Sequence, residues 1–266
     1  MRYHYLEQYI ASAQHRITIN LVGCGGTGSH MLTNLATLSH AMVKLGKQPL
    51  FVRVYDPDKV DEFNVGRQMF SVSDIGEYKS DVLVTRCNRF FGTEWMSYPE
   101  MYCETTEMRK EDFGANFIIS CVDSVKSRRM ISDMYPLPRM IKASQGDIYN
   151  NSGHMSYRTP YYWMDIGNTR KSGQIILGTL RQIKQPDEES LGFLPGFFQE
   201  FLDVTELRNE PSCSLAESLL HQDLFINKIM ATHASNMLWT LLKEFRINYR
   251  GIYINLENVK TTPILI

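Results

Sequence analysis

The chain carries, at residues 23–29, the stretch Gly23-Cys24-Gly25-Gly26-Thr27-Gly28-Ser29. An apolar, β-branched run precedes it at residues 17–22, and apolar residues recur behind it at helical spacing up to residue 45. A strand, a glycine-rich turn and a helix in this order present backbone N–H groups at the positive end of a helix dipole, which attracts phosphate groups. The stretch therefore predicts a nucleotide site whose floor is formed by Gly23, Gly25, Gly26 and Gly28. The alternative is a tight turn that binds no ligand.

A second apolar run at residues 51–55 ends at Asp56. A carboxylate in that place can accept hydrogen bonds from ribose hydroxyls, and the alternative is that it caps the turn before Pro57. Two strands joined by a helix form a βαβ unit. We therefore expect an α/β fold with a Rossmann-like, mostly parallel central sheet flanked by helices, and antiparallel strands toward the C-terminal half.

The remaining pattern extends this fold over the whole chain. We expect helices at residues 6–13, 74–91, 124–134 and 215–245, and strands at 117–122, 161–166, 174–177, 251–256 and 263–266. Gly167 and Asn168 read as a turn, and residues 136–160 carry only a weak pattern. Residues 1–266 are expected to form a single domain, with a nucleotide-binding core at 17–135 and a candidate mobile crossover loop at 187–214.

Composition excludes several classes of protein. A net charge of −1 argues against a nucleic-acid scaffold. The N-terminal residues do not form a signal peptide, and no long uncharged apolar run predicts a membrane span, so we expect a cytoplasmic protein. The five cysteines include no Cys-x-x-Cys pair, so no structural zinc is expected.

Polar residues crowd the loop-like sequence behind the second strand: Asp58, Asn64, Arg67, Gln68 and Lys79. A guanidinium and an ammonium aimed at one site suit a triphosphate better than a nicotinamide, because they can neutralise charge that develops on phosphates. Asp123 follows the strand at 117–122 and is placed to bind Mg²⁺, which prefers one or two carboxylates plus phosphate oxygens. The alternative for each single charge is a solvated surface residue.

Together these motifs resemble the adenylation domain of the ThiF/MoeB/HesA superfamily, whose members are relatives of ubiquitin-activating enzymes. The resemblance spans residues 17–129 and is carried by the glycine turn, Asp56-x-Asp58-x-Val60-x-x-x-Asn64-x-x-Arg67-Gln68, Gly76-x-x-Lys79 and Cys121-Val122-Asp123-Ser124. Two later stretches look like the ThiF-type proteins of bacterial PRTRC gene systems: Trp163-Met164-Asp165-Ile166-Gly167-Asn168 and Pro211-Ser212-Cys213-Ser214-Leu215-Ala216-Glu217.

The resemblance implies that the C-terminal glycine of a ubiquitin-like or sulfur-carrier protein attacks the α-phosphate of ATP. Asp56 would hold the ribose, while Asn64, Arg67 and Lys79 would contact ribose or phosphates. Asp58 would belong to the same nucleotide site, Gln68 would support its loop, and Asp123 would bind Mg²⁺. A homodimer is expected, and in some relatives a partner's arginine enters the site; here Arg2 and Arg16 are the N-terminal arginines, and this role stays open.

Cys213 follows Pro211 in a predicted loop just ahead of the helix at 215–245. A helix N-terminus lowers the pKa of a nearby thiol, and some relatives pass the acyl group to a cysteine thioester. A conjugating-enzyme-like protein would then be the acceptor. Alternatively, Cys213 is a packed residue in a helix cap. Two other functions stay open for the whole chain: an NAD-dependent oxidoreductase and a non-catalytic nucleotide-binding scaffold.

Overall fold

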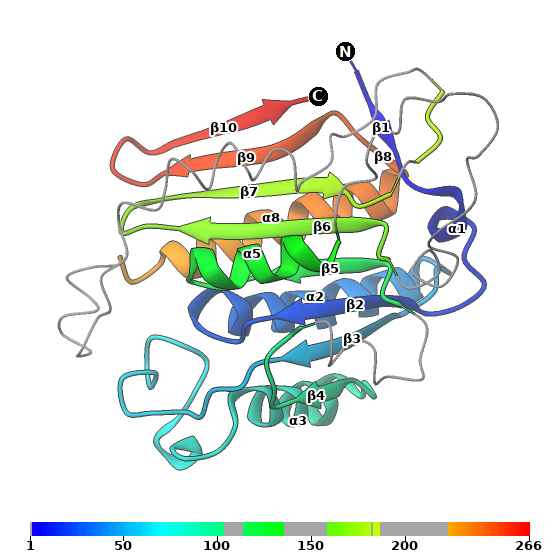
Figure 1. The fold of residues 1–266 in the computed structure, drawn as a ribbon. Helices are drawn as coiled ribbons and strands as arrows, with labels where there is room; N and C mark the ends of the chain where they lie inside the picture. The colour runs from blue at the N-terminus through cyan, green and yellow to red at the C-terminus, as the bar shows by residue number, and fades with distance from the viewer. Residues whose placement is uncertain (1, 104–113, 136–158, 182, 187–222) are drawn as a thin grey trace.

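The structure, a computed structural model, describes residues 2–103, 114–135, 159–181, 183–186 and 223–266. In these ranges the main sheet has eight strands in the order β10-β9-β7-β6-β5-β2-β3-β4 (Figure 1). It is a mixed sheet flanked by helices, which confirms the expected fold class. Within the described ranges, no helix combines the length and the apolar character that crossing a bilayer requires.

The parallel half of the sheet consists of five strands centred on β2. They are β2 (Ile17–Val22), β3 (Leu50–Tyr55), β4 (Met96–Tyr98), β5 (Phe117–Ser120) and β6 (Tyr162–Asn168). Strand β2 lies between β3 and β5 and pairs in parallel with both. Every residue of β3 is buried. An apolar run without alternation therefore forms a strand covered on both faces.

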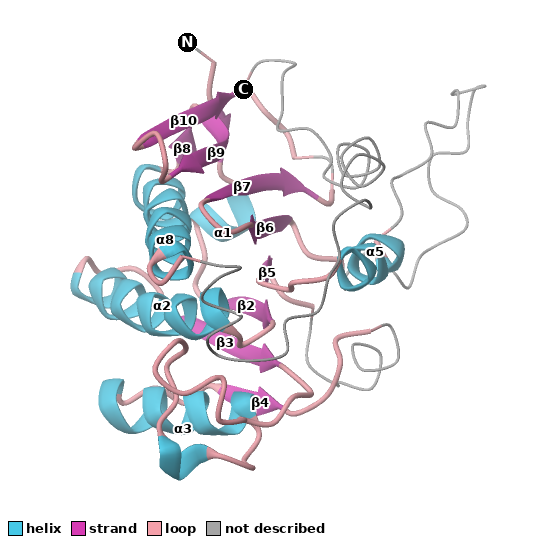
Figure 2. Cartoon of the chain, turned by 90° about the vertical axis from the view of Figure 1, so that its left-hand side faces the viewer, coloured by secondary structure: helices cyan, strands magenta, loops and turns pink. Residues whose placement is uncertain are grey.

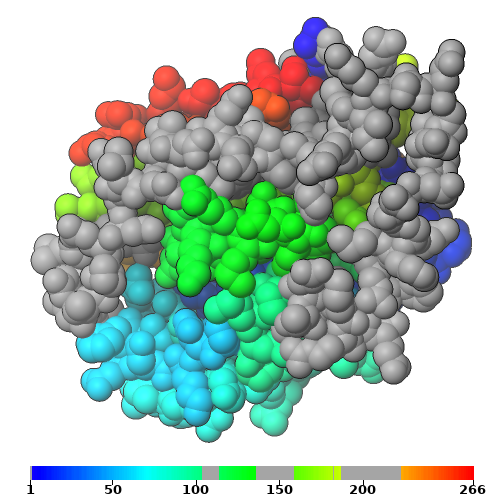
Figure 3. All heavy atoms as spheres, viewed as in Figure 1, coloured from blue at the N-terminus to red at the C-terminus, as the bar shows by residue number. Residues whose placement is uncertain are grey.

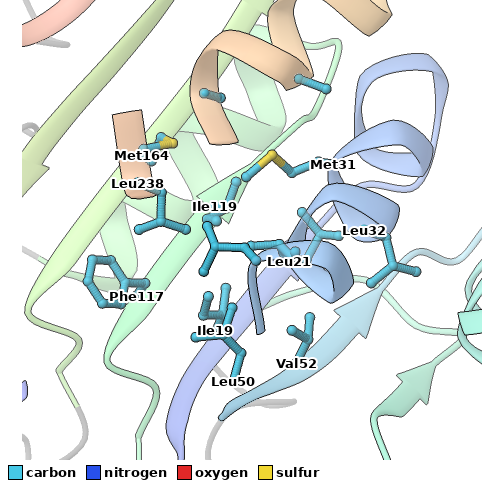
Figure 4. Close-up of a cluster of buried hydrophobic side chains, with 14 of the residues drawn as sticks. Ile19, Leu21, Met31, Leu32, Leu50, Val52, Phe117, Ile119, Met164 and Leu238 are labelled. Carbon is cyan, nitrogen blue, oxygen red and sulfur yellow. The ribbon is translucent and has the colours of Figure 1, made fainter. Parts of the chain in front are cut away.

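Within the described ranges, helices cover the two faces of the sheet unequally (Figure 2). On one face lie α2 (Gly26–Lys44), α3 (Lys79–Phe91) and α8 (Ile226–Glu244), and on the other lies α5 (Val125–Met134). A 3₁₀ turn, η1 (Val72–Asp74), precedes α3, and a short helix, α1 (Gln8–Ala11), precedes β2. The main core fills the space beneath α2 and α8, as Figure 4 shows for Leu21, Met31, Ile119 and Leu238.

Antiparallel strands complete the sheet beyond β6. They are β7 (Ser172–Thr179), β9 (Tyr249–Asn255) and β10 (Lys260–Leu265), and each pairs antiparallel with its neighbour. A separate two-stranded sheet joins β1 (His4–Tyr5) to β8 (Arg246–Ile247). The expected antiparallel strands of the C-terminal half are thereby confirmed.

Several local expectations were wrong. Gly167 and Asn168 do not form a turn, because the long antiparallel pairing with β7 continues β6 to Asn168. The helix expected at 215–245 is not continuous, since residues 223–225 are not helical and α8 begins at Ile226; residues 215–222 lie outside the described ranges. Helix α3 begins at Lys79, after the 3₁₀ turn. Cys213 and the candidate crossover loop lie outside the described residues.

Candidate nucleotide site

The carboxyl ends of the parallel strands meet at one edge of the sheet, on the left in Figure 1. Val22, the last residue of β2, is in register with Tyr55 of β3 and with Ser120 of β5. The turn after β2, Asp56 after β3 and residues 121–124 after β5 must therefore lie side by side. From β2 the chain continues to β3 on one side of it, whereas the later strand β5 lies on its other side, so the strand order reverses at β2. Such a reversal is a topological switch point, and open α/β sheets bind ligands at the carboxyl ends of the strands there.

Close backbone contacts shape the glycine turn. A Cβ atom on Gly28 would lie 1.9 Å from the carbonyl oxygen of Gly23, so only glycine fits at this position. Gly23 itself has a φ of +91°, and a Cβ atom there would meet the carbonyl oxygen of Cys121 at 3.0 Å. These two glycines let α2 approach β2 closely and bring the turn against the start of loop 121–124.

The first turn of α2 is open to a ligand. Among the described residues, no side chain caps this helix at Gly25, and no atom lies within 4 Å of the place where a Gly25 Cβ atom would be. The next glycine is different, because a Cβ atom on Gly26 would lie 2.4 Å from the side-chain nitrogen of Asn227 in α8. The N–H groups that begin an α-helix lack intrahelical partners, so this end of α2 fits an anion.

Asp56 ties the end of β3 to the glycine turn. Its carboxylate accepts hydrogen bonds from the backbone N–H of Cys24 at 2.5 Å and from that of Asp58 at 2.9 Å. Burial raises the pKa of the Asp56 carboxyl, and the two backbone hydrogen bonds oppose the rise. The contact with Asp58 is the turn-capping interaction considered from the sequence. Each carboxylate oxygen keeps further lone-pair capacity for a ribose hydroxyl.

Lys79 is a buried cation beside this carboxylate. Its ammonium donates to the carboxylate of Asp58 at 2.9 Å, and the Lys79 side chain is 9% exposed against 64% for Asp58. Lys79 also acts to lower the pKa of Asp56, which places its charge near the end of β3. Lys79 is the first residue of α3, where the helix dipole disfavours a positive charge. Neither burial nor the dipole favours a lysine at this position.

The loop that carries Asn64, Arg67 and Gln68 rests against the first turn of α2. The backbone N–H of Met69 donates to the Ser29 hydroxyl at 3.4 Å, and the backbone N–H of Gln68 donates to the Asn64 carbonyl at 3.0 Å. Asn64 is buried, and its side-chain oxygen accepts the N–H of Asp61 at 3.0 Å.

The side chains of Arg67 and Gln68 bring a cation and an open acceptor to this loop. Burial lowers the pKa of the half-buried Arg67 guanidinium, while the nearby Asp61 carboxylate raises it. The Gln68 side-chain oxygen is buried, and no donor among the described residues reaches it. A hydroxyl or amino group of a ligand would satisfy this acceptor.

Asp123 is an exposed carboxylate on loop 121–124, next to the turn at Gly23. Among the described residues, no three His, Cys, Asp or Glu side chains gather into a metal cluster. A single carboxylate nevertheless fits Mg²⁺, which takes its other ligands from phosphate oxygens and water. Asp123 is therefore the residue at this edge that would hold Mg²⁺ together with a nucleotide.

Sequence reasoning missed two contacts that connect β6 to the site. On one face of the sheet, the buried Asp165 pairs with Arg128 of α5, whose side chain is 12% exposed. On the other face, the Thr27 hydroxyl is 3.3 Å from the side-chain oxygen of Asn168 and 3.0 Å from that of Asn227. An aspartate within an otherwise apolar strand was the available signal for the first contact, since a buried carboxylate needs a partner.

The sequence model of the ThiF family matches residues 11–163, which include the glycine turn, Asp56, Lys79 and Asp123. The chain belongs to the ThiF family. No match was found among curated proteins.

Solved structures share the fold at low sequence identity. E. coli MccB is 12% identical with a TM-score of 0.59, over 96% of this chain and 64% of that one. PaaA is 13% identical with a TM-score of 0.58, over 94% and 64% of the two chains. A structure of E. coli MccB with ATP is 13% identical with a TM-score of 0.56, over 96% and 65%. This ThiF-family chain therefore spans slightly less than two thirds of the length of each of these structures.

Proposed function

We propose that this ThiF-family protein adenylylates the C-terminal glycine of a ubiquitin-like or sulfur-carrier protein. The observation that carries the proposal is the meeting, at one sheet edge, of an uncapped helix N-terminus, a buried lysine and an exposed aspartate. Family membership supports an ATP-dependent adenylyltransferase of the ubiquitin-activating kind. That MccB has been solved with ATP, and also with MccA, supports a nucleotide and a polypeptide as the two substrates.

In the reaction, an oxygen of the substrate carboxylate forms a bond to the α-phosphorus of ATP. The bond from that phosphorus to the bridging oxygen breaks, and pyrophosphate leaves with the electron pair. Both reactants are anions, so the site must offset their repulsion with positive charge and backbone donors. The first-turn N–H groups of α2 provide such donors, and Asp56, Asn64 and Gln68 provide polar contacts for the ribose and its neighbours.

Lys79 and Arg67 provide the positive charge. The present partner of Lys79 is the exposed Asp58, so a phosphate can replace that carboxylate without leaving it buried and unpaired. Arg67 lies on the loop beside the first turn of α2 and can pair bidentately with phosphate oxygens. Both cations stabilise the charge that builds up on the phosphates as the leaving group departs.

Mg²⁺ is proposed as the metal, with Asp123 as its ligand. When bound, it would neutralise phosphate charge. The protein's own contribution is to hold the Asp123 carboxylate at the end of β5, beside the glycine turn. No structural zinc is proposed.

Cys213 is proposed to attack, as a thiolate, the carbonyl carbon of the acyl-adenylate, so that the carbon–oxygen bond to AMP breaks, AMP leaves, and a thioester forms that is then passed to a conjugating-enzyme-like protein. Asp223, ten residues later, donates its backbone N–H to the Arg170 carbonyl in the β6–β7 turn at 2.8 Å, and Asn227 then reaches the glycine turn. Ten extended residues span at most about 35 Å, so the chain between Cys213 and Asp223 is long enough for the proposed transfer at this edge of the sheet. A reducible adduct with the carrier protein should form with the wild type and disappear in Cys213→Ala while adenylylation persists. An adduct that survives the substitution reassigns the nucleophile.

A cytoplasmic homodimer akin to the PRTRC-type proteins is the proposed form, with no nucleic acid or membrane as partner. Arg16 lies before β2, at the opposite end from the candidate site, and its guanidinium stacks 4.1 Å from the centre of the Phe51 ring of its own chain. That contact disfavours Arg16 as an arginine supplied to a partner, and Arg2 remains the candidate.

Exchange of radiolabelled pyrophosphate into ATP tests the function. With a cognate carrier ending in Gly-Gly, the wild type should catalyse exchange, and Arg67→Ala should lower its rate by at least tenfold, the loss expected from one charged hydrogen bond in a transition state. No exchange with any such carrier would support the scaffold alternative. Tight NAD binding without ATP binding would support the oxidoreductase instead.

A further inference from the structure

A buried ion pair lies directly beneath the loop that carries Asp123. The guanidinium Nε of Arg128, in α5, lies 3.1 Å from both carboxylate oxygens of Asp165 in β6. Their side chains are 12% and 2% exposed. Helix α5, drawn in green in Figure 3, lies at the surface of that face, so the pair is covered by the helix that begins just after Asp123.

Further hydrogen bonds connect this ion pair to the backbone of the Asp123 loop on one side and to β5 and β6 on the other. The Nη2 atom of Arg128 donates to the carbonyl oxygen of Val122, the residue before Asp123, at 2.6 Å. The Ser120 hydroxyl donates to Asp165 at 2.6 Å, and the indole N–H of Trp163 donates to that hydroxyl at 2.7 Å. A chain of contacts therefore runs from Trp163 through Ser120, Asp165 and Arg128 to the backbone of the Asp123 loop.

The strand β6 is shaped to admit this contact. A Cβ atom on Gly167 would lie 3.1 Å from Nη2 of Arg128, so a larger residue there would press on the guanidinium. Both ends of loop 121–124 are also held by hydrogen bonds. At its start, the N–H of Cys121 donates to the Val22 carbonyl at 2.8 Å, and at its end Ser124 caps α5. Within the loop, residues 121, 122 and 124 are fixed by contacts, whereas the Asp123 side chain is exposed.

Stability alone is a poor explanation for such a pair. Two charges must be taken out of water, and apolar residues of similar volume often replace a buried pair with no loss of stability. By contrast, metal affinity falls strongly when residues that do not touch the metal but hold its ligands in place are substituted. We propose that Arg128 and Asp165 are positioning residues that hold the Asp123 loop in the geometry that binds the metal–nucleotide complex. This inference rests on the proposed function.

The test separates positioning from folding with an apolar double variant, Arg128→Met/Asp165→Leu. It removes both charges together, so no unpaired charge is left in the interior, and its melting temperature should match or exceed that of the wild type. Affinity for ATP is then measured calorimetrically, once with Mg²⁺ and once with a chelator. We expect the affinity with Mg²⁺ to fall by about tenfold to 100-fold and the affinity without metal to stay within about threefold.

A milder variant and a control variant are measured alongside the double variant. Ser120→Ala removes one hydrogen bond to Asp165 and should weaken binding in the same direction, by less, in case the double variant does not fold. Lys171→Ala breaks an exposed ion pair with Glu257 and should change neither affinity.

The outcomes distinguish a failure of the positioning role from a failure of the proposed adenylylation. If the folded double variant and Ser120→Ala both bind MgATP as the wild type does, or lose affinity equally with and without metal, the positioning role is overturned while the proposed function stands. If the wild type itself binds no ATP, the proposed function fails and this inference fails with it.

Discussion

At Gly28, the space for a side chain is missing altogether. A Cβ atom there would lie 1.9 Å from a backbone oxygen, which cannot move as a flexible side chain could. Gly28→Ala should therefore destabilise the protein by at least about 2 kcal/mol, the cost of overpacking a rigid site. Gly25→Ala is the matched control, because none of the residues that the structure describes comes within 4 Å of its Cβ position and its φ is −70°. Thermal unfolding of the two variants checks this. Equal melting temperatures would contradict the close approach of α2 to β2.

Lys79 should show opposite effects on stability and on binding. Lys79→Met removes a buried cation from the start of α3, where neither burial nor the dipole favours it, so the unliganded protein should melt at the same or a higher temperature. The same variant should lose about tenfold to 100-fold in ATP affinity, as expected for one charged hydrogen bond. Fluorescence-monitored melting and calorimetric titration measure the two quantities. A variant that melts earlier but binds ATP normally would mean that Lys79 serves the fold instead.

At the scale of elements, β1 is attached to the sheet through a buried histidine. His4 is fully buried, and its Nε2 lies 2.9 Å from the hydroxyl of Tyr162 in β6. Burial lowers the pKa of His4 from 6.5 to about 4. The folded protein therefore keeps His4 neutral at pH values where the unfolded chain binds a proton.

The direction of the pH effect follows from that difference. Between pH 6.5 and 4 the unfolded state binds more protons, so the free energy of unfolding should fall as the pH falls through this window. The contribution of His4 is on the order of 3 kcal/mol, fully lost only below the folded pKa. Urea unfolding of the wild type and of His4→Gln at several pH values isolates it. If both proteins lose stability in parallel, His4 is not the group responsible.

Helices and strands with strong patterns were predictable, and their ends were less so. The bounds of β2 agree with its apolar run because the strand is buried on both faces. Strand β4 has three residues and β1 has two, too few for a period to appear, and both form only because a neighbouring strand supplies their hydrogen bonds. Gly167 and Asn168 carry a turn signal, yet pairing with β7 outweighs it.

On the scale of the whole molecule, the positions of the glycine turn and of Asp56, though not their proposed contacts with a nucleotide, were predictable because they follow strands whose parallel order a βαβ pattern implies. The contacts of Asp165 with Arg128 and of Thr27 with Asn227 were not, because the partners are 37 and 200 residues apart. Such pairs depend on the strand order of the finished sheet. The roles of Arg67, Lys79 and Asp123 remain predictions, and that of Cys213 concerns a residue outside the described ranges.

The central claim is that this edge of the sheet directs attack at the α-phosphate of ATP. The most direct test is to incubate the protein with a carrier ending in Gly-Gly and ATP labelled at either the α- or the γ-phosphate, and to identify the labelled products. We predict that α-label appears as AMP on the carrier, or as free AMP once the acyl group has passed to Cys213, and that γ-label appears as pyrophosphate, with both products reduced by at least tenfold in Lys79→Met. ADP as the nucleotide product, with γ-label either on the carrier or in inorganic phosphate, would contradict the account.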